Sequence, residues 1–301
     1  MKEININKRY QIFKKNFTKK NYKIIAPFLF KIKLKSDEIK KLQNSALIFL
    51  NSAFKFKDFK NLENILKTIK RNNFKNISTS GLIVPKYYSS LEYNLFMREF
   101  YECINNLGVN VQKWYTSLPV RIKFGDFVPK NFSIQDSSTL HVDSPTGFST
   151  NCFAIFYNIG GDIKNNYIKF WRLKKNIKKL PYSLLIGKPT NIKLEIAKKF
   201  IEPLNFKLKF GEILIADNII YHQTIRNKKC GNRISIDNLC EPKFTYGKDE
   251  KSKYRKTDLV ETSKLLNLGK RYIYHYPHDD DKFKKTYGLR SPAHKKEIKF
   301  L

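Results

Sequence analysis

The sequence is poor in cysteine and has no long apolar run. Its 301 residues include four cysteines, none of them in the CxxC spacing that half a zinc site requires. We therefore expect free thiols in a reducing compartment and no disulfide framework. The longest apolar stretches, Ile24–Phe30 and Ala46–Leu50, fall far short of the ~20 residues that span a membrane. The first twenty residues contain no apolar segment typical of a secretory signal, so these absences together predict a soluble, cytoplasmic protein.

Acidic residues are also scarce. The chain has 26 Asp and Glu against 59 Lys and Arg, which gives a formal net charge of +33. The lysines are spread along the whole chain, as expected if codon usage alone enriched them. The alternative is attraction to an anionic partner such as nucleic acid, a phosphorylated substrate or a lipid headgroup. A hydrophobic content of 41% and an aromatic content of 14% suffice for a folded core and exclude a disordered chain.

The N-terminal region, residues 1–118, is predicted to be mostly helical and to brace the rest of the fold from outside. Ser36 followed by two acidic residues is a favourable helix start, and apolar residues then recur at three-and-four spacing. Residues 1–35 alternate lysine with aromatic and aliphatic residues, which we interpret as short extended segments. The predicted helices cover 37–52, 58–71 and 90–106.

Beyond residue 118 the hydrophobic period changes from that of a helix to that of a strand. Apolar residues at 120, 122 and 124 alternate with Arg121 and Lys123, the pattern of a half-buried strand. Seven or eight such strands predict an antiparallel sandwich or barrel over 119–245, followed by a basic C-terminal extension, 246–301, as a candidate lid. The further strands are predicted near 138–143, 152–158, 167–172, 206–210, 212–216, 219–224 and 232–239, with a helical insertion near 190–202.

Two of the five histidines lie in apolar strands of this second region. His141 and Asp143 are two residues apart on a predicted strand, so their side chains point to the same face. His222 follows on another predicted strand. Two imidazoles and one carboxylate are the ligands of the facial triad of non-heme Fe(II) oxygenases, which leaves three coordination positions open. An HxD pattern alone is also compatible with a surface turn or a core histidine.

A third element lies eleven residues after His222. Arg233 and Ser235 share one face of a predicted strand while Ile234 and Ile236 take the other. An arginine buried inside a barrel is unfavourable unless it meets an anion. A planar guanidinium beside a hydroxyl is suited to bind a carboxylate through two parallel hydrogen bonds.

The HxD motif, the second histidine and the Arg-x-Ser motif together resemble the Fe(II)/2-oxoglutarate-dependent dioxygenase superfamily. The stretch 210–217, which leads to His222, is similar to the strand and turn that deliver the distal histidine there. The separation of His222 and Arg233 is most similar to the phytanoyl-CoA-hydroxylase-like branch. The resemblance covers about residues 120–245.

This resemblance implies a mainly β fold with helices outside, built on a double-stranded β-helix (jelly roll). It implies that His141, Asp143 and His222 hold Fe(II), and that Arg233 with Ser235 binds the distal carboxylate of 2-oxoglutarate. With O2 as the other co-substrate, the implied activity is hydroxylation of a small or anionic organic substrate, with release of succinate and CO2.

Two residues of this sequence differ from those of related families, and they reduce the range of expected reactions and substrates. Asp143 argues against a halogenase, which has a small residue at that position, and Leu239 stands where AlkB-like demethylases carry a second arginine. The missing arginine makes nucleic acid a less favoured substrate than an anionic small molecule or a glycolipid headgroup. The alternative function is a catalytically silent jelly-roll protein that binds nucleic acid or an anionic membrane surface. The segment 275–281, with two histidines and three acids, is interpreted as a loop near the mouth of the site.

Overall fold

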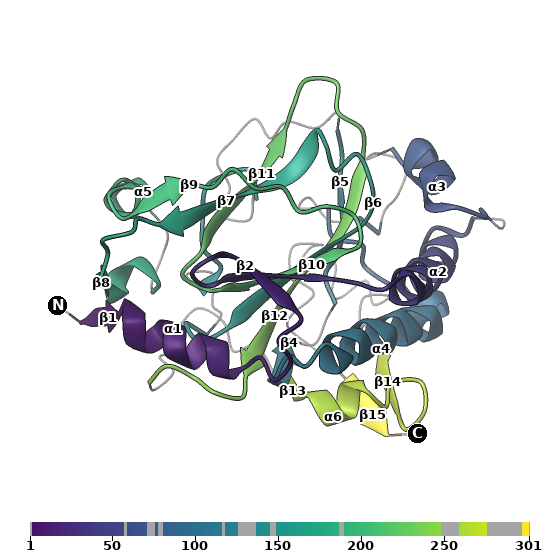
Figure 1. The fold of residues 1–301 in the computed structure, drawn as a ribbon. Coiled ribbons are helices and arrows are strands. Elements are labelled where there is room, and N and C mark those ends of the chain that lie inside the picture. The colour runs from purple at the N-terminus through teal and green to yellow at the C-terminus, as the bar shows by residue number, and fades with distance from the viewer. Residues whose placement is uncertain are drawn as a thin grey trace.

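Two antiparallel sheets form the centre of the molecule, and helices lie around them (Figure 1). The computed structural model describes residues 2–56, 59–70, 76–77, 81–115, 118–125, 137–144, 149–186, 190–247, 259–275 and 297–300.

The larger sheet has eight strands. The long strand β12 lies near its middle and pairs with three others, because β5 and β4 share one of its edges and β6 takes the other. In spatial order the strands are β13 (Leu259–Glu261), β4 (Val111–Tyr115), β12 (Arg233–Pro242), β6 (Phe153–Gly161), β10 (Glu212–Asp217), β3 (Leu29–Lys33) and β2 (Tyr22–Ala26), with β5 (Val120–Lys123) beside the first half of β12.

The smaller sheet consists of β11 (Tyr221–Arg226), β7 (Asn166–Leu173) and β9 (Ile201–Pro203) in that order. An isolated bridge between His141 and His222 adds a fourth segment to the edge of β11. Phe156 of β6 contacts the rings of Phe170 and His222, so the inner faces of the two sheets meet. From β5 to β12 the chain passes repeatedly between the sheets, which is the path of a double-stranded β-helix. The predicted fold class is confirmed.

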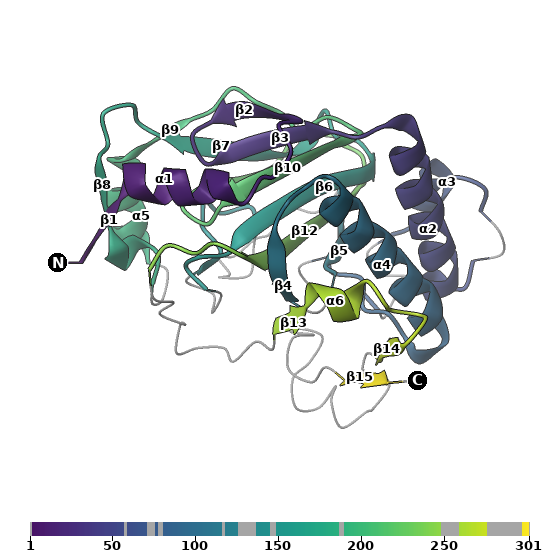
Figure 2. The same cartoon turned by 60° about the horizontal axis from the view of Figure 1, so that its bottom comes forward.

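Three helices cover the outer side of the larger sheet. They are α2 (Ser36–Phe54), α3 (Leu62–Thr68) and α4 (Ser90–Asn106), and α2 and α4 lie side by side in both views (Figures 1 and 2). Phe49 of α2 contacts Tyr93 of α4, and Tyr101 of α4 contacts Trp114 of β4. The helices predicted over 37–52 and 90–106 are confirmed, and α3 is shorter than the predicted 58–71 within the described residues.

The prediction of extended segments over 1–35 is wrong for α1 (Ile6–Lys15). The Asn5 side chain caps this helix by accepting a hydrogen bond from the Lys8 backbone N–H at 2.9 Å. Ile6, Arg9 and Phe13 are buried at helical spacing, a periodicity that the frequent lysines obscure. The later strands β2 and β3 agree with the prediction, and they join the larger sheet, so the N-terminal region contributes strands as well as helices.

Two predicted strands differ from those observed. The segment 206–210 is irregular, because the Leu208 carbonyl accepts a hydrogen bond from the Asn158 side chain and takes no part in a strand ladder. The predicted strand over 138–143 is reduced to the single bridge at His141. The predicted insertion near 190–202 contains α5 (Asn191–Lys198), and a small separate pair joins β1 (Glu3–Asn5) to β8 (Lys179–Pro181).

The described part of the C-terminal extension packs at the α4 end of the larger sheet (Figure 2). It contains α6 (Thr262–Leu265) and a hairpin-like pair of β14 (Tyr272–His275) with β15 (Glu297–Phe300). Most of the candidate lid, including residues 276–296, lies outside the described residues. No described helix combines the length and apolar character needed to cross a membrane.

Candidate active site

The two histidines predicted as metal ligands face each other across a backbone bridge. The His141 N–H donates to the His222 carbonyl at 3.0 Å, and the His222 N–H donates to the His141 carbonyl at 2.9 Å. Directly opposed residues in such a pair have neighbouring side chains, and the two imidazole centroids are 4.4 Å apart. The rings of Phe156 and Phe170 contact His222 from the barrel side. The bridge therefore brings together two side chains that are far apart in the sequence.

Backbone carbonyls set the tautomer of both histidines. Nδ1 of His141 lies 2.6 Å from the Thr139 carbonyl oxygen, and Nδ1 of His222 lies 3.3 Å from the Ile220 carbonyl oxygen. A carbonyl can only accept, so each Nδ1 carries the hydrogen and donates it. Each Nε2 then presents its lone pair, which is the arrangement that orients metal-binding histidines.

The Asp143 carboxylate completes the cluster. One of its oxygens lies 3.9 Å from His141 Nε2, and the other lies 3.8 Å from His222 Nε2. One donor atom from each of the three residues lies within 4.8 Å of the others, a spacing that a single ion could bridge with small side-chain movements. His222 is buried, whereas the side chains of His141 and Asp143 are each 22% exposed. The cluster is therefore open on one side.

The surroundings keep His141 uncharged. Burial lowers its pKa below the ordinary histidine value, and the neighbouring His222 lowers it further, while Asp143 acts in the opposite direction. A neutral imidazole is the form that binds a metal.

Arg233, the predicted anion-binding residue, is completely buried in the barrel. Its Nη1 donates to Asn158 Oδ1 at 2.8 Å, and the Asn158 amide is held in turn by donating to the Leu208 carbonyl at 3.0 Å. The Nε and Nη2 atoms have no hydrogen-bond partner among the described residues. These two atoms form one edge of the planar guanidinium, the edge that can meet both oxygens of a carboxylate. Burying two hydrogen-bond donors without an acceptor lowers the stability of the fold. An anion bound beside Nε and Nη2 would supply the missing acceptors.

Lys123 lies directly across the strand pair from Arg233 and was not predicted as a site residue. It is only 4% exposed, and its Nζ donates to Ser137 Oγ at 2.6 Å. Thr224, two residues after His222, also donates to Ser137 Oγ, at 3.1 Å. Lys123 and Thr224 therefore share the Ser137 hydroxyl, which lies between β5, the strand that pairs with Arg233, and β11, the strand that carries His222.

Several basic groups lie near Arg233. Burial lowers the pKa of Lys123 to about 7, and the positive charges of Arg121 and Arg233 also lower it, while Asp237 opposes them. Burial likewise lowers the pKa of Arg233 to about 10, so this group stays charged at neutral pH. Asp237 is engaged by Arg121, whose Nε donates to it at 2.7 Å.

Ser235, the second predicted anion-binding residue, lies on β12 with Arg233. It is 2% exposed and opposes Asn158 of β6 in the strand pairing. A bulge between Ile234 and Ser235 shifts the register toward β6, whereas pairing toward β5 stays regular. Asn158 therefore lies opposite Ser235 in the strand pair and accepts a hydrogen bond from Arg233.

Comparison with known proteins yields structural similarity without a sequence match. No protein-family model matches the chain, and no curated protein matches it significantly. The chain is similar in structure to SnoN, which is described as a non-heme alpha ketoglutarate dependent epimerase from nogalamycin biosynthesis. The two sequences are 10% identical, the TM-score is 0.41, and the match covers 78% of this chain and 81% of that chain.

Two further solved structures resemble this chain to a similar degree. EctD from S. alaskensis, with 2-oxoglutarate and 5-hydroxyectoine, is 13% identical with a TM-score of 0.41, covering 71% of this chain and 72% of that chain. HygX from Streptomyces hygroscopicus, with nickel and 2-oxoglutarate bound, is 10% identical with a TM-score of 0.37, covering 72% and 83% respectively.

Proposed function

We propose that this protein is an Fe(II)- and 2-oxoglutarate-dependent oxygenase. The observation that carries the proposal is the pairing of two features in one barrel. One is a His-Asp-His cluster whose donor atoms lie within 4.8 Å of one another. The other is a buried arginine whose Nε and Nη2 have no hydrogen-bond partner in the part of the chain that the structure describes. The donor set fits Fe(II), because two neutral imidazoles and one carboxylate leave positions for a bidentate co-substrate and O2.

His141, Asp143 and His222 would hold the metal, and Arg233 with Ser235 and Lys123 would hold the distal carboxylate of 2-oxoglutarate. When bound, Fe(II) with 2-oxoglutarate and O2 supplies an oxidative decarboxylation that yields succinate and CO2 and oxidises a second substrate. The Thr139 and Ile220 carbonyls keep each Nε2 aimed at the metal position. The rings of Phe156 and Phe170 pack against His222 and would limit the access of water to its ring.

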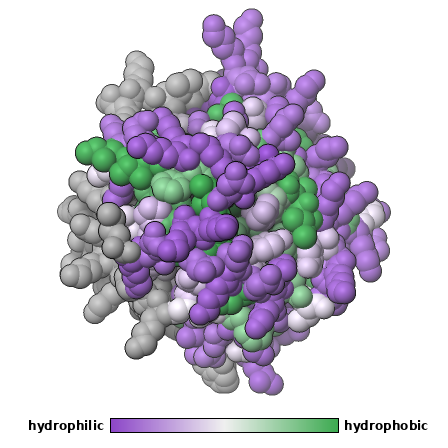
Figure 3. Space-filling model, turned by 60° about the vertical axis from the view of Figure 1, so that its left-hand side comes forward, coloured by the Kyte–Doolittle hydropathy of each residue, from purple (hydrophilic) through white to green (hydrophobic). Residues whose placement is uncertain are grey.

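The finer part of the proposal is hydroxylation of a small, anionic organic substrate by an enzyme of the phytanoyl-CoA-hydroxylase-like branch. The eleven-residue separation of His222 and Arg233 supports the branch. The cationic interior and the net charge of +33 support an anionic substrate. Figure 3 shows a largely hydrophilic face on which hydrophobic residues form separate small groups, so this face offers no broad apolar docking surface.

The direct test is turnover of 2-oxoglutarate. We expect the Fe(II)-loaded protein to convert 2-oxoglutarate to succinate and CO2 slowly without a second substrate and faster with its true substrate. The substrates to be screened are anionic lipids, sugars, amino acids and nucleic acids. For an anionic substrate, the apparent affinity should fall as salt rises, because exposed charges are screened beyond ~8 Å at physiological ionic strength. If the protein releases no succinate and binds DNA, RNA or anionic vesicles tightly, it is the catalytically silent binding protein.

The buried lysine predicts an unusual pH dependence of co-substrate binding. With a pKa of about 7 in the free protein, Lys123 is mostly neutral at pH 9 and must take up a proton to pair with a carboxylate. The affinity for 2-oxoglutarate should therefore fall as pH rises from 7 to 9, by up to about tenfold per pH unit. Binding is to be measured without O2, by titration of the Co(II)-loaded protein.

Two variants check that Lys123 is responsible. In Lys123→Met the affinity for 2-oxoglutarate should no longer change between pH 7 and pH 9, and it should be weak at every pH. In Lys169→Met, which alters a lysine stacked on the Trp171 ring, the pH dependence should persist. The charged groups around Lys123, namely Arg121, Arg226, Arg233 and Asp237, are unchanged in both variants. An unaltered pH dependence in Lys123→Met would assign the titration to another group.

A further inference from the structure

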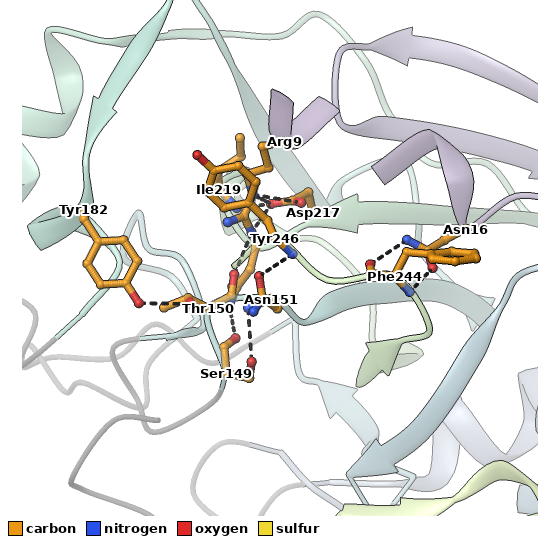
Figure 4. A network of polar contacts seen from close by, with 11 residues as sticks. Arg9, Asn16, Ser149, Thr150, Asn151, Tyr182, Asp217, Ile219, Phe244 and Tyr246 are labelled. Atoms are coloured by element: carbon orange, nitrogen blue, oxygen red, sulfur yellow. Dashed lines mark hydrogen bonds and ion pairs between the residues drawn. The ribbon is translucent and has the colours of Figure 1, made fainter. Parts of the chain in front are cut away.

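A buried ion pair joins the N-terminal helix to the end of a barrel strand. Arg9 of α1 and Asp217 of β10 are 2% and 4% exposed. The Arg9 Nε donates to both carboxylate oxygens of Asp217, at 2.9 and 3.1 Å, and Nη2 donates to the backbone carbonyl of Thr150 at 2.6 Å. Figure 4 shows Arg9 at the centre of this network. One side chain from α1 thus binds two segments that are distant in sequence.

The first of these segments leads directly into His222. Asp217 ends β10, and its Oδ1 accepts a hydrogen bond from the Ile219 backbone N–H at 3.0 Å. The Ile220 backbone N–H donates to the Asp217 carbonyl at 3.0 Å and closes the turn into β11. The Ile220 carbonyl is the same group that orients the His222 ring. The carboxylate of Asp217 therefore sets the turn from which the His222 ring takes its orientation.

The second segment follows Asp143. Residues Ser149–Asn151 are buried, and the Asn218 side chain donates to the Ser149 carbonyl at 2.8 Å. Thr150 contacts the Tyr182 hydroxyl at 3.3 Å. This segment is therefore linked to the turn before His222 through Asn218. A second link runs through Arg9 (Figure 4).

We propose that Arg9 is a positioning residue for the metal cluster. It acts through Asp217 on the turn that leads into His222, and through Thr150 it holds residues 149–151 against the same turn, so a helix outside the two sheets fixes the backbone from which the His222 ring projects. The inference rests on the proposed function, because the cluster matters in this way only if it binds a metal. Ligand geometry of this kind depends on supporting contacts beyond the ligands themselves.

Helix α1 makes other buried contacts with the rest of the protein. The positioning role of Arg9 can therefore be tested separately from the stability of the fold. Phe13 contacts Phe28, Phe30 and Phe153. At the end of the helix, the Asn16 side chain donates to the Phe244 carbonyl at 2.9 Å and accepts from the Phe244 N–H at 2.9 Å. These contacts keep α1 docked when the Arg9 link is lost.

The test variant is Arg9→Met combined with Asp217→Asn. The double substitution leaves no unpaired buried charge, and the carboxamide oxygen can still accept from the Ile219 N–H, but the link from α1 to Thr150 is gone. We expect the O2-free affinity for Co(II), measured by chelator competition, to fall about tenfold, and the visible d–d bands of the bound ion to change. Arg9→Lys keeps a charge beside Asp217 and should give an intermediate affinity.

The matched control is Asn16→Ser, which removes the hydrogen bonds of α1 to Phe244 and leaves the turn before His222 and residues 149–151 untouched. It should lower the unfolding temperature while leaving Co(II) affinity and the d–d bands unchanged. Unchanged affinity and bands in the folded double variant would overturn the inference, as would an equal loss of affinity in Asn16→Ser. If the unaltered protein binds no Co(II), the proposed function fails instead, so the two failures are distinguishable.

Discussion

The His222→Ala variant is expected to lose metal binding and to remain folded. The truncation removes one of three donors, and the loss of Fe(II) or Co(II) affinity should be at least about a hundredfold, since even supporting contacts beyond the ligands are worth ten- to a hundredfold. The backbone bridge to His141 survives, because it uses only main-chain groups. The buried ring and its contacts with Phe156 and Phe170 are lost, which should lower the free energy of unfolding by about 2 kcal/mol. The measurements are O2-free metal titration and thermal unfolding.

A companion series identifies the ligands individually. His141→Ala and Asp143→Ala should give the same loss of metal affinity as His222→Ala. His278→Ala, in the histidine- and acid-containing segment that lies outside the described residues, should bind metal as the unaltered protein does. Undiminished metal binding in the His141 and His222 variants, with loss in the His278 variant, would place the metal site in that other segment.

The candidate ligands could be predicted from the sequence because period-two alternation needs only local information. Each candidate pair has members two residues apart in the sequence, namely His141 with Asp143 and Arg233 with Ser235. In an extended segment, residues at this spacing have side chains on the same side. The pairing of His141 with His222 could not be predicted in the same way. It depends on a single bridge between two chain segments, and the expected strand around His141 is almost absent.

Lys123 illustrates what local pattern alone leaves open. Its alternation with apolar neighbours is typical of a half-buried strand, and a charged residue in such a strand is usually exposed to water. In the folded chain both sides of β5 are covered here, since Lys123 is 4% exposed opposite Arg233 and Ile122 is 1% exposed. Only the packing of the folded chain decides which residues of such a strand are covered. The sequence did contain one indication. Arg121 and Lys123 alternate with apolar residues in the same way as Arg233 and Ser235 do.

The N-terminal helix was missed for a different reason. Lysines occur throughout residues 1–35, so the apolar spacing of Ile6 and Phe13 is hidden among charged residues. The decisive member of the buried stripe is Arg9, a residue that pattern analysis counts as polar. It is buried because Asp217, 208 residues later, supplies a carboxylate. Such a partner is evident only in the folded chain.

The Arg233→Met variant is expected to separate co-substrate binding from stability. Each charge-assisted hydrogen bond to the carboxylate is worth about 1.5–3 kcal/mol, or roughly ten- to a hundredfold in affinity. Losing the pair from Nε and Nη2 should weaken 2-oxoglutarate by at least about a hundredfold while metal affinity stays nearly constant. Both affinities can be measured by titration of the Co(II)-loaded protein without O2.

Stability should respond very differently to the same substitution. Removing a buried charge whose Nε and Nη2 lack partners among the described residues favours the folded state, whereas Asn158 loses the donor to its Oδ1, at a cost of about 1–3 kcal/mol. Asp237 keeps its hydrogen bond from Arg121, so no carboxylate is left unpaired. We therefore expect an unfolding temperature close to that of the unaltered protein.

The control for this variant is Arg172→Met, which removes an arginine of the smaller sheet. The Arg172 Nε donates to Glu202 at 2.8 Å, and both side chains of this ion pair are 36% exposed. A pair so accessible to water contributes little to stability, so the control should unfold near the same temperature and bind 2-oxoglutarate normally. Full co-substrate affinity in Arg233→Met, or its loss in Arg172→Met, would each contradict the assignment of the buried guanidinium to the carboxylate.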